Sequence, residues 1–578
     1  MMVQRIERVD SIPLIITWLM RMRVHEIIDG IYISHRNWEG LSYGQLAVLF
    51  VTYVLYTLTH RLSGMESWLI NHKTVIEQVT GWKISDKDAT DDRLGRMVEV
   101  LGKDEEKRVE YQLQIGRHLI CAYELPTDIA RYDTTSFNVY HQGDDSKDGI
   151  LEFGHSKNYR PDLLQFKQGL GTLDPAGVPL MTETMPGNKA DDRCYVPAWQ
   201  QMSKTIGHTQ FLYIADCKAA SMETRVAIDK GKGYYLFPLP MTGDTPDILE
   251  ALVLSPPQKP QEIILEPKTT DKEDKPRKVG VGFTIEKQME GQLEDGSSYQ
   301  WVERWMVTQS DAHAQRQKKA FMERLANAEK KLSHLKPKKG ESVEAFLARA
   351  EQILKEQKVK EAISVEVKES ITLKKKYHGK GRPGPNTPYT MIEIKDMKLS
   401  VQRNEHAISL YLSLAGWRIY VTNTSSDRMT LNQSAKYYRD EYLVERGFHR
   451  FKNGSLPALP LFLRIPARIK GLMMLLTIAL QALTLIEYVV RRELTNRNET
   501  IAGLVPGNPK MKTTRPTAER LLSQFDNLHL VVEENETQIK GNSIESINHL
   551  QRLILSLLRL PENIYNLSFV NLKLKNCS

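Results

Sequence analysis

The sequence predicts an α/β fold with three parts: an all-helical N-terminal domain, a domain built around a sheet, and an α+β insertion that interrupts this second domain. Two observations predict it. Apolar residues recur with a helical period from Val9 to about Ile120, and the period changes to two after Pro126. The composition then shifts at about Thr242, where prolines and mixed charges begin, and a strand pattern resumes at residues 416–422.

Length and charge bound the classes of function. A chain of 578 residues is long enough for about three to five domains with a substantial core. Lys and Arg number 79 against 71 Asp and Glu, which gives a net charge of +8. This mild excess is compatible with binding to a polyanion, and equally with many enzymes that bind none.

The cysteines and the apolar runs bear on the compartment. Four cysteines without a Cys-x-x-Cys pair offer neither a disulfide framework nor a zinc motif, so a reducing cytosol is expected. Charged residues interrupt the start of the chain, and no signal peptide is expected. Apolar runs at 41–59 and 471–486 predict buried helices and no membrane association, because the first carries several polar side chains and the second is shorter than the roughly 20 residues that a bilayer requires.

Residues 1–125 are expected to form the helical domain. Its clearest helical segments are 12–20, 45–58 and 98–120. Basic and aromatic side chains along these helices, among them Arg21, Arg36 and Trp38, predict a DNA-binding surface. The same residues are ordinary on a solvated helical face, and this alternative stays open.

Residues 126–245 are expected to form the first part of the sheet domain. Strand patterns lie at 129–140, 163–173, 178–185, 209–216 and 233–239. Helices are expected at about 195–206 and directly after Ser221, which can cap the second of them. Three meandering strands, a helix, a buried strand, a helix and a strand are the element order of a ribonuclease-H-like fold.

The rest of the chain is expected to hold the insertion, the second part of the sheet domain and a C-terminal tail, at 246–396, 397–500 and 501–578. In the second part, residues 438–452 separate at helical spacing into two faces. The apolar stripe is Val444, Phe448 and Phe451, and the polar stripe is Glu441, Glu445, His449 and Lys452. A surface helix with a solvated charged face explains the same pattern.

Three carboxylates are the candidates for chemistry: Asp133 in mid-strand, Asp216 at the end of a buried strand, and Glu445 on the amphipathic helix. Two central strands with a helix packed across them would bring the three together. Their mutual repulsion is relieved by two hard divalent cations, Mg²⁺ or Mn²⁺, which support an in-line displacement at phosphorus. Each residue taken alone is also explained as an ordinary strand-end or surface carboxylate.

Four motifs carry a resemblance to a known family. They are Tyr-Asp-Thr-Thr at 132–135, Gly-His-Ser-Lys-Asn-Tyr-Arg-Pro-Asp-Leu-Leu-Gln at 154–165, Ala-Asp-Cys-Lys at 215–218, and the stretch 438–452. The chain resembles bacterial insertion-sequence transposases of the DDE type, in the family-four superfamily and specifically its sixteen-thirty-four branch, over most of its length. The resemblance implies an endonuclease and strand-transfer enzyme of DNA transposition and recombination. Asp133, Asp216 and Glu445 would be catalytic and would bind two Mg²⁺ ions.

The resemblance also has departures. The family signature Tyr-(2)-Arg-(3)-Glu-(6)-Lys fits this chain at Tyr438, Glu445 and Lys452, but its arginine position is Glu441 here. One phosphate contact would then have to come from a neighbouring arginine. Cys217 also stands where many relatives carry serine.

Double-stranded DNA is the expected partner, both as terminal inverted repeats and as target, bound by a homodimer that associates with the nucleoid in a bacterial cytoplasm. The predicted DNA contacts are Tyr438, Arg446, Arg450, Lys452, His155, Lys157, Arg160, Trp301 and Trp305. Trp301 and Trp305 share one face of a strand in the insertion. They either stack on a base flipped out of the DNA or pin the insertion to the sheet domain.

Two alternative functions fit the same sequence. A catalytically inactive, transposase-derived DNA-binding protein would keep DNA affinity without Mg²⁺-dependent nicking. A structural helical protein whose acidic residues are incidental would have no salt-sensitive affinity for DNA.

Overall fold

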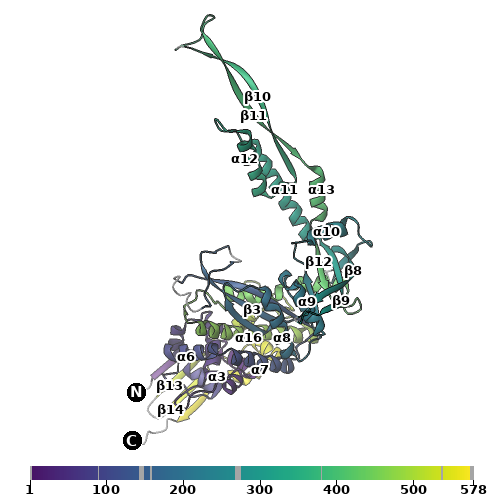
Figure 1. Cartoon of the computed structure of the whole chain (residues 1–578). Helices are drawn as coiled ribbons and strands as arrows, with labels where there is room; N and C mark the ends of the chain where they lie inside the picture. Colours follow the sequence, from purple (N-terminus) through teal and green to yellow (C-terminus); the bar gives the residue numbers. More distant parts are fainter. Residues whose placement is uncertain are drawn as a thin grey trace.

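The protein consists of a compact body of helices and strands from which a long arm projects (Figure 1). The computed structural model describes residues 3–88, 90–141, 149–155, 159–266, 275–293, 295–378, 380–534, 538–543 and 545–572. Of the predicted contact residues, Lys157 lies outside the described residues.

The N-terminal part is mainly helical. Its helices are α1 (Ile12–Arg21), α2 (Val24–Ile31), α3 (Tyr43–Thr57), α4 (Met65–Asn71), α5 (Lys73–Thr80), α6 (Asp91–Lys103) and α7 (Glu105–Tyr123). The predicted segment 98–120 is divided between α6 and α7 at Asp104, whose side chain accepts a hydrogen bond from the amide of Lys107 and caps the second helix.

The prediction of an all-helical N-terminal domain is wrong at its start. Strand β1 (Val3–Arg8) opens a four-stranded sheet with three strands from the C-terminal tail, β13 (His529–Glu534), β14 (Gln538–Ser543) and β15 (Phe569–Leu572). The tail also contributes the helices α17 (Ala518–Leu522) and α18 (His549–Leu557). The two ends of the chain therefore lie beside each other (Figure 1). A six-residue strand with two apolar side chains gives no period of its own, because its partner strand lies more than 500 residues away.

The body also contains a nine-stranded mixed sheet in the order β4-β3-β2-β5-β6-β12-β9-β8-β7. Its first five strands are β2 (Ile129–Val139), β3 (Leu164–Leu173), β4 (Val178–Pro186), β5 (Leu212–Ile214) and β6 (Tyr234–Pro238). Strands β2, β3 and β4 form an antiparallel meander, and β5 and β6 run parallel to β2. Helices α8 (Tyr195–Ile206) and α9 (Met222–Lys230) connect these strands, and Ser221 caps α9 as its sequence predicts.

Helix α16 (Pro466–Arg497) lies between the N-terminal helices and the sheet, since it contacts both α6 and β4. Glycine permits the crossing with α6: a Cβ on Gly102 would lie 1.7 Å from the carbonyl oxygen of Ala467, and one on Gly471 would lie 1.9 Å from that of Val98. Within the described residues α16 is the one helix that is by itself long and apolar enough to cross a bilayer. Its most apolar window is 94% buried inside the protein, which is typical of a core helix.

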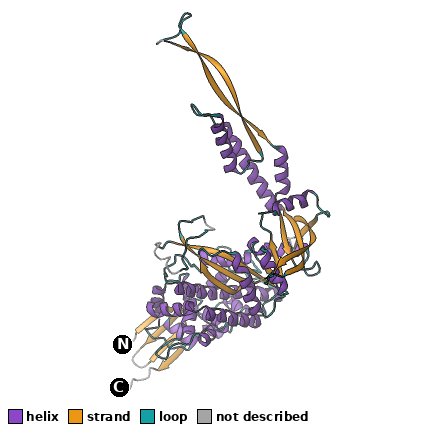
Figure 2. Cartoon of the chain, viewed as in Figure 1, coloured by secondary structure: helices purple, strands orange, loops and turns teal. Residues whose placement is uncertain are grey.

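The chain between β6 and β12 (Trp417–Thr422) extends the sheet and builds the arm. Helix α10 (Thr245–Leu254) and strands β7 (Gln261–Leu265), β8 (Arg277–Gln292) and β9 (Ser298–Ser310) precede the arm. The arm consists of α11 (Asp311–Ser333), α12 (Val343–Gln357), β10 (Ile363–Tyr377), β11 (Tyr389–Arg403) and α13 (Glu405–Leu414). The expected insertion boundary at residue 396 falls inside β11, so it divides a hairpin (Figure 2).

Candidate active site

Asp133 and Asp216 stand at equivalent positions on two neighbouring parallel strands. In the register between β2 and β5, Arg131 lies opposite Ile214, and each aspartate follows two residues later in its chain. Neighbouring strands lie about 4.8 Å apart, so the two aspartates meet at the carboxyl end of β5. This is the place where an open α/β sheet holds its ligands.

Both aspartates are held by donors of their own neighbourhood. One carboxylate oxygen of Asp216 accepts hydrogen bonds from the hydroxyl of Tyr195 and from the amide of Lys218, at 3.1 Å for the amide. Asp133 accepts from the amide of Thr134 at 2.7 Å. Burial and the charge of Asp216 raise the pKa of Tyr195 well above its ordinary value, so this hydroxyl stays a hydrogen-bond donor. Tyr195 is a site residue that the sequence gives no signal for.

Glu445 lies on helix α15 (Tyr442–Asn453), which contacts β2, β3 and α16. The predicted apolar stripe of Val444, Phe448 and Phe451 is buried as expected. Gly447 lets the helix approach, because a Cβ there would lie 2.9 Å from Leu170 of β3 and 3.1 Å from Leu480 of α16. Glu445 itself is exposed on the other side of the helix, at the edge where Asp133 and Asp216 lie.

The stretch 438–452 is not one helix. Helix α14 (Leu431–Arg439) ends before α15 begins, and Glu441 occupies the junction as the residue that precedes α15. The two helices serve different parts of the sheet, since α14 contacts β7 and β8 whereas α15 contacts β2 and β3. Tyr438 is anchored on α14 by the ring of Tyr420, with the ring centroids 4.7 Å apart.

Glu441 is the fourth carboxylate of the site. It is half-buried, and burial together with the negative charges of Asp133, Glu445 and Asp216 raises the pKa of Glu441 to about 7. The four carboxylates therefore lie within electrostatic reach of one another. Glu441 stands where the resembled signature has arginine, and this departure is the signal that could have marked it.

The donors of this site are the ones that a hard divalent cation prefers. Asp133, Asp216, Glu441 and Glu445 offer carboxylate oxygens only, on β2, after β5 and around the start of α15. The proton that Glu441 keeps near neutral pH is the sign of an excess of negative charge that cations relieve. Among the residues that the structure describes, no three His, Cys, Asp or Glu side chains are yet gathered closely enough to hold a metal ion.

Lys452 and Tyr438 lie close to the carboxylates. Lys452 donates a hydrogen bond to the hydroxyl of Thr135 at 2.7 Å, and Thr135 shares a face of β2 with Asp133. Tyr438 lies close enough to Asp216 and Glu441 for their charges to raise its pKa further, beyond the effect of burial. The structure thus brings together five predicted residues: Asp133, Asp216, Tyr438, Glu445 and Lys452.

Arg446 and Arg450 occupy a different environment. Both pair with Glu487 of α16, at 2.5 and 2.6 Å, and Arg450 also binds Glu519 at 2.9 Å. Burial opposes ionisation of Glu519, yet Arg450 lowers the pKa of this carboxyl to about 2. Arg450 is buried, so the predicted DNA contact at this residue is replaced by a structural ion pair. The partner glutamates lie far along the chain, where spacing on one helix cannot reveal them.

We predict that Arg450→Met lowers the stability of the protein by about 3 kcal/mol, because it leaves Glu487 and Glu519 partly uncompensated in a buried position. The salt dependence of DNA binding should stay unchanged. Thermal unfolding and a salt titration of DNA affinity measure the two effects, with the exposed Lys436→Met as the control for loss of one cation. A salt slope that falls by about one, with stability retained, would place Arg450 on DNA instead.

Trp301 and Trp305 are core residues of the extended sheet. Each is only 6% exposed. The indole of Trp301 donates to the hydroxyl of Tyr235 on β6, and that of Trp305 donates to Glu303, both at 3.0 Å. Of the two alternatives, the described contacts favour the one that pins the insertion to the sheet, and a DNA contact would require both rings to leave this core.

His155 and Arg160 lie on the exposed connection between β2 and β3. The guanidinium of Arg160 pairs with Asp162 at 2.6 Å and lies 5.9 Å from the ring of Tyr140. The structure leaves both residues accessible, and it does not join them to the carboxylates.

Comparisons with known proteins were made for the whole chain. No protein-family profile and no curated protein matches it. One solved structure that matches is the cryo-EM structure of a piggyBac transposase synaptic complex with hairpin DNA, at 10% sequence identity and a TM-score of 0.24. The match covers 50% of this chain and 60% of the other, so this chain corresponds to less than two thirds of the length of that transposase.

Proposed function

We propose that this protein is a DNA transposase of ribonuclease-H-like fold, which cleaves a phosphodiester bond at the end of an insertion sequence and transfers the freed end into target DNA. The observation that supports it best is the register between β2 and β5, which sets Asp133 and Asp216 level on adjacent strands, with α15 and Glu445 packed across them. The antiparallel meander followed by two parallel strands is the strand arrangement expected of such a fold.

The residues divide the work of this reaction. Asp133, Asp216 and Glu445 would hold two Mg²⁺ ions, which supply charge stabilisation for the attacking and leaving oxygens of an in-line displacement. Tyr195 fixes one oxygen of Asp216 by donating to it, which leaves the other oxygen directed elsewhere. Lys452 presents its ammonium on the same face of β2 as Asp133, where it is suited to a phosphate as a point charge.

The direct test is cleavage of DNA by the full chain. The substrate is a duplex that carries the inverted repeats found beside the coding region, and the product is separated by denaturing electrophoresis. We expect Mg²⁺-dependent strand breaks with a 3′-hydroxyl at the repeat ends, and none in excess EDTA. Breaks that persist in EDTA, or none with Mg²⁺ or Mn²⁺, would contradict the proposal.

A second candidate is a catalytically inactive DNA-binding protein derived from a transposase. The observation that favours it is that the described carboxylates are near one another but not gathered as a metal site. The cleavage assay separates the two, because the inactive protein would bind the same duplex in both conditions and cut it in neither.

Glu441 gives the site a pH dependence. The folded protein keeps a proton on this carboxyl up to about pH 7, whereas its ordinary pKa is 4.5, so its contribution to stability is full below about pH 4.5 and is lost as the pH rises through 7. We predict that in EDTA the wild type loses on the order of 1–3 kcal/mol relative to Glu441→Gln between about pH 5 and about pH 8.

Thermal unfolding of both proteins across this range measures the difference. Exposed Glu405→Gln is the matched control and should follow the wild type at every pH. Parallel curves for the wild type and Glu441→Gln would mean that Glu441 titrates at its ordinary pKa.

A further inference from the structure

The arm ends in a two-stranded ribbon that extends beyond the helices beside it (Figure 1). Strands β10 and β11 pair from Ile363 opposite Arg403 to Tyr377 opposite Tyr389. Fifteen residues in each strand give the ribbon a length of about 50 Å. Its base is covered: Ile363 belongs to the core formed with α11 and α12, and Val365, Leu399 and Val401 pack against it.

Beyond the helices the same face of the ribbon carries apolar side chains that nothing in the described chain covers. The register sets these residues on one face, and they are between 42% and 60% exposed: Ile371, Leu373, Tyr377, Tyr389 and Met391. A face of large apolar side chains on an exposed ribbon is unusual for a surface that only meets water.

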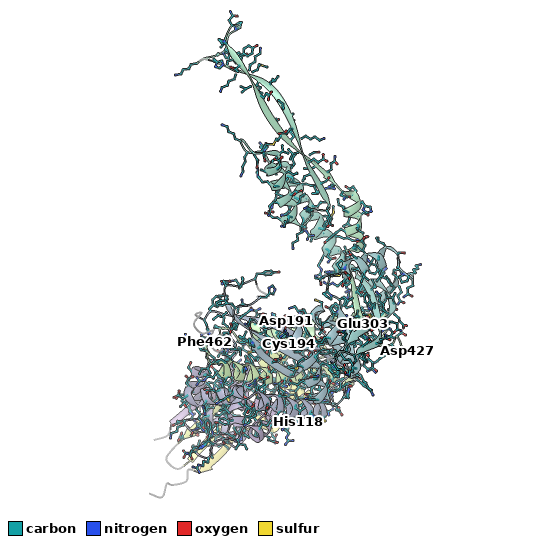
Figure 3. All side chains as sticks on the ribbon, in the orientation of Figure 1. His118, Asp191, Cys194, Glu303, Asp427 and Phe462 are labelled. Carbon is teal, nitrogen blue, oxygen red and sulfur yellow. The ribbon has the colours of Figure 1, made fainter. Side chains whose placement is uncertain are left out.

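The charge of this distal part has one sign. Beyond the pair formed by Leu373 and Glu393, the ribbon and its tip contain five basic residues and no acidic ones. The basic residues are Lys374, Lys375, Lys376, Lys380 and Arg382. All five are exposed, and they occur on both faces of the ribbon and at the tip (Figure 3). The tip also holds Pro383, Pro385 and Pro388.

We propose that the distal part of the ribbon is a DNA-binding arm that lies in a groove of duplex DNA. The major groove admits a two-stranded ribbon, and β-ribbons are known to read DNA from within a groove. The lysines on the two faces reach the phosphates on either side. The apolar side chains face the base edges, and the prolines stiffen the tip.

Edge protection and self-association each account for only part of this ribbon's composition. Lysine protects the free edges of a sheet against aggregation, but glutamate protects them equally well, so protection does not explain charge of a single sign. A second copy of the ribbon would cover the apolar face, but it would bring the two copies of Lys375 and their neighbours together without an acidic partner. A polyanion with stacked bases satisfies both the charge and the apolar side chains.

The arm points away from the body that holds Asp133 and Asp216 (Figure 1). Its binding to DNA is therefore separate from cleavage, and it can be measured on a protein that does not cut. A failure of the proposed catalytic function would leave this measurement unaffected, since the readout is affinity in EDTA.

The first test replaces Lys374, Lys375, Lys376 and Lys380 by alanine. The matched control makes the same change of charge on α11, with Lys318, Lys319, Lys330 and Lys331 replaced by alanine. We expect the arm variant to bind an arbitrary duplex about 10- to 100-fold more weakly at about 0.1 M salt, with a salt slope smaller by about two to four. Equal losses in the two variants would overturn the proposal.

The second test shortens the ribbon. Leu373–Glu393 is replaced by Asn-Gly, which closes a two-residue hairpin between Thr372 and its partner Ile394 and keeps the base packed on α12. We expect unchanged thermal stability and the same loss of affinity as in the charge variant. If sedimentation instead shows that shortening only dissociates a dimer, with the affinity of each protomer for DNA retained, the ribbon is a contact between copies and the proposal fails.

Discussion

Strand cleavage is expected to fall by about a thousandfold or more when Asp133, Asp216 or Glu445 is replaced by its amide. Each change keeps the shape of the side chain and removes the negative charge that holds a divalent cation, which supplies several kcal/mol of stabilisation to the reaction. DNA affinity in EDTA should remain close to that of the wild type. Gel assays of cleavage with Mg²⁺ and anisotropy titrations without it measure the two effects.

The controls are amide substitutions of the same kind on the surface. Asp427→Asn and Glu405→Gln change exposed carboxylates outside the site and should leave cleavage unaltered (Figure 3). A variant at Asp133, Asp216 or Glu445 that cuts near the wild-type rate would remove that residue from the catalytic group. Loss of cleavage with an equal loss of DNA affinity would instead indicate that the site was distorted.

The pair of aspartates was accessible from the sequence, whereas the rest of the site was only partly so. Asp133 and Asp216 each occupy a strand whose period or buried run is visible locally, and the element order fixes which strands adjoin. The position of Glu445 followed from its apolar stripe. The break between α14 and α15 did not, because helical spacing continues across residues 440–441 although the two helices pack on different strands.

The partners of charged residues explain the remaining differences. Arg450 has the sequence of a surface cation, and only the fold reveals that Glu487 and Glu519 surround it. Glu441 is a departure from a signature in the sequence and a fourth carboxylate in the structure. The alternation of β9 placed Trp301, Glu303 and Trp305 on one face correctly, but the contacts of that face depend on β6 and α9, which lie in another part of the chain.

Glu303 is a fully buried carboxylate at the junction between the extension strands and the first part of the sheet (Figure 3). Arg225 of α9 binds both of its oxygens, at 2.8 and 2.9 Å, and Tyr235 and Trp305 donate to them as well. Arg225→Met removes the compensating charge and leaves the carboxylate in a dry environment. We expect a loss of about 3–5 kcal/mol, which lowers the unfolding temperature by roughly 5–10 °C.

The double variant Arg225→Met with Glu303→Gln decides whether charge is the cause. The amide keeps an acceptor for Tyr235 and Trp305 but needs no cation, so most of the lost stability should return. A double variant no more stable than Arg225→Met would mean that Arg225 acts through packing of its side chain alone.

The same junction separates the two roles of the tryptophans. If Trp305 pins the extension strands to the sheet, Trp305→Ala lowers the unfolding temperature by several degrees, and cleavage falls in proportion to the folded fraction, because the ring is 6% exposed and bound to Glu303. Trp301→Ala should behave alike through its bond to Tyr235. The opposite result is unchanged stability together with loss of the fluorescence rise of a base analogue at the DNA end. It would require Trp305 to leave the core on binding, and it would restore the role of a base-stacking residue.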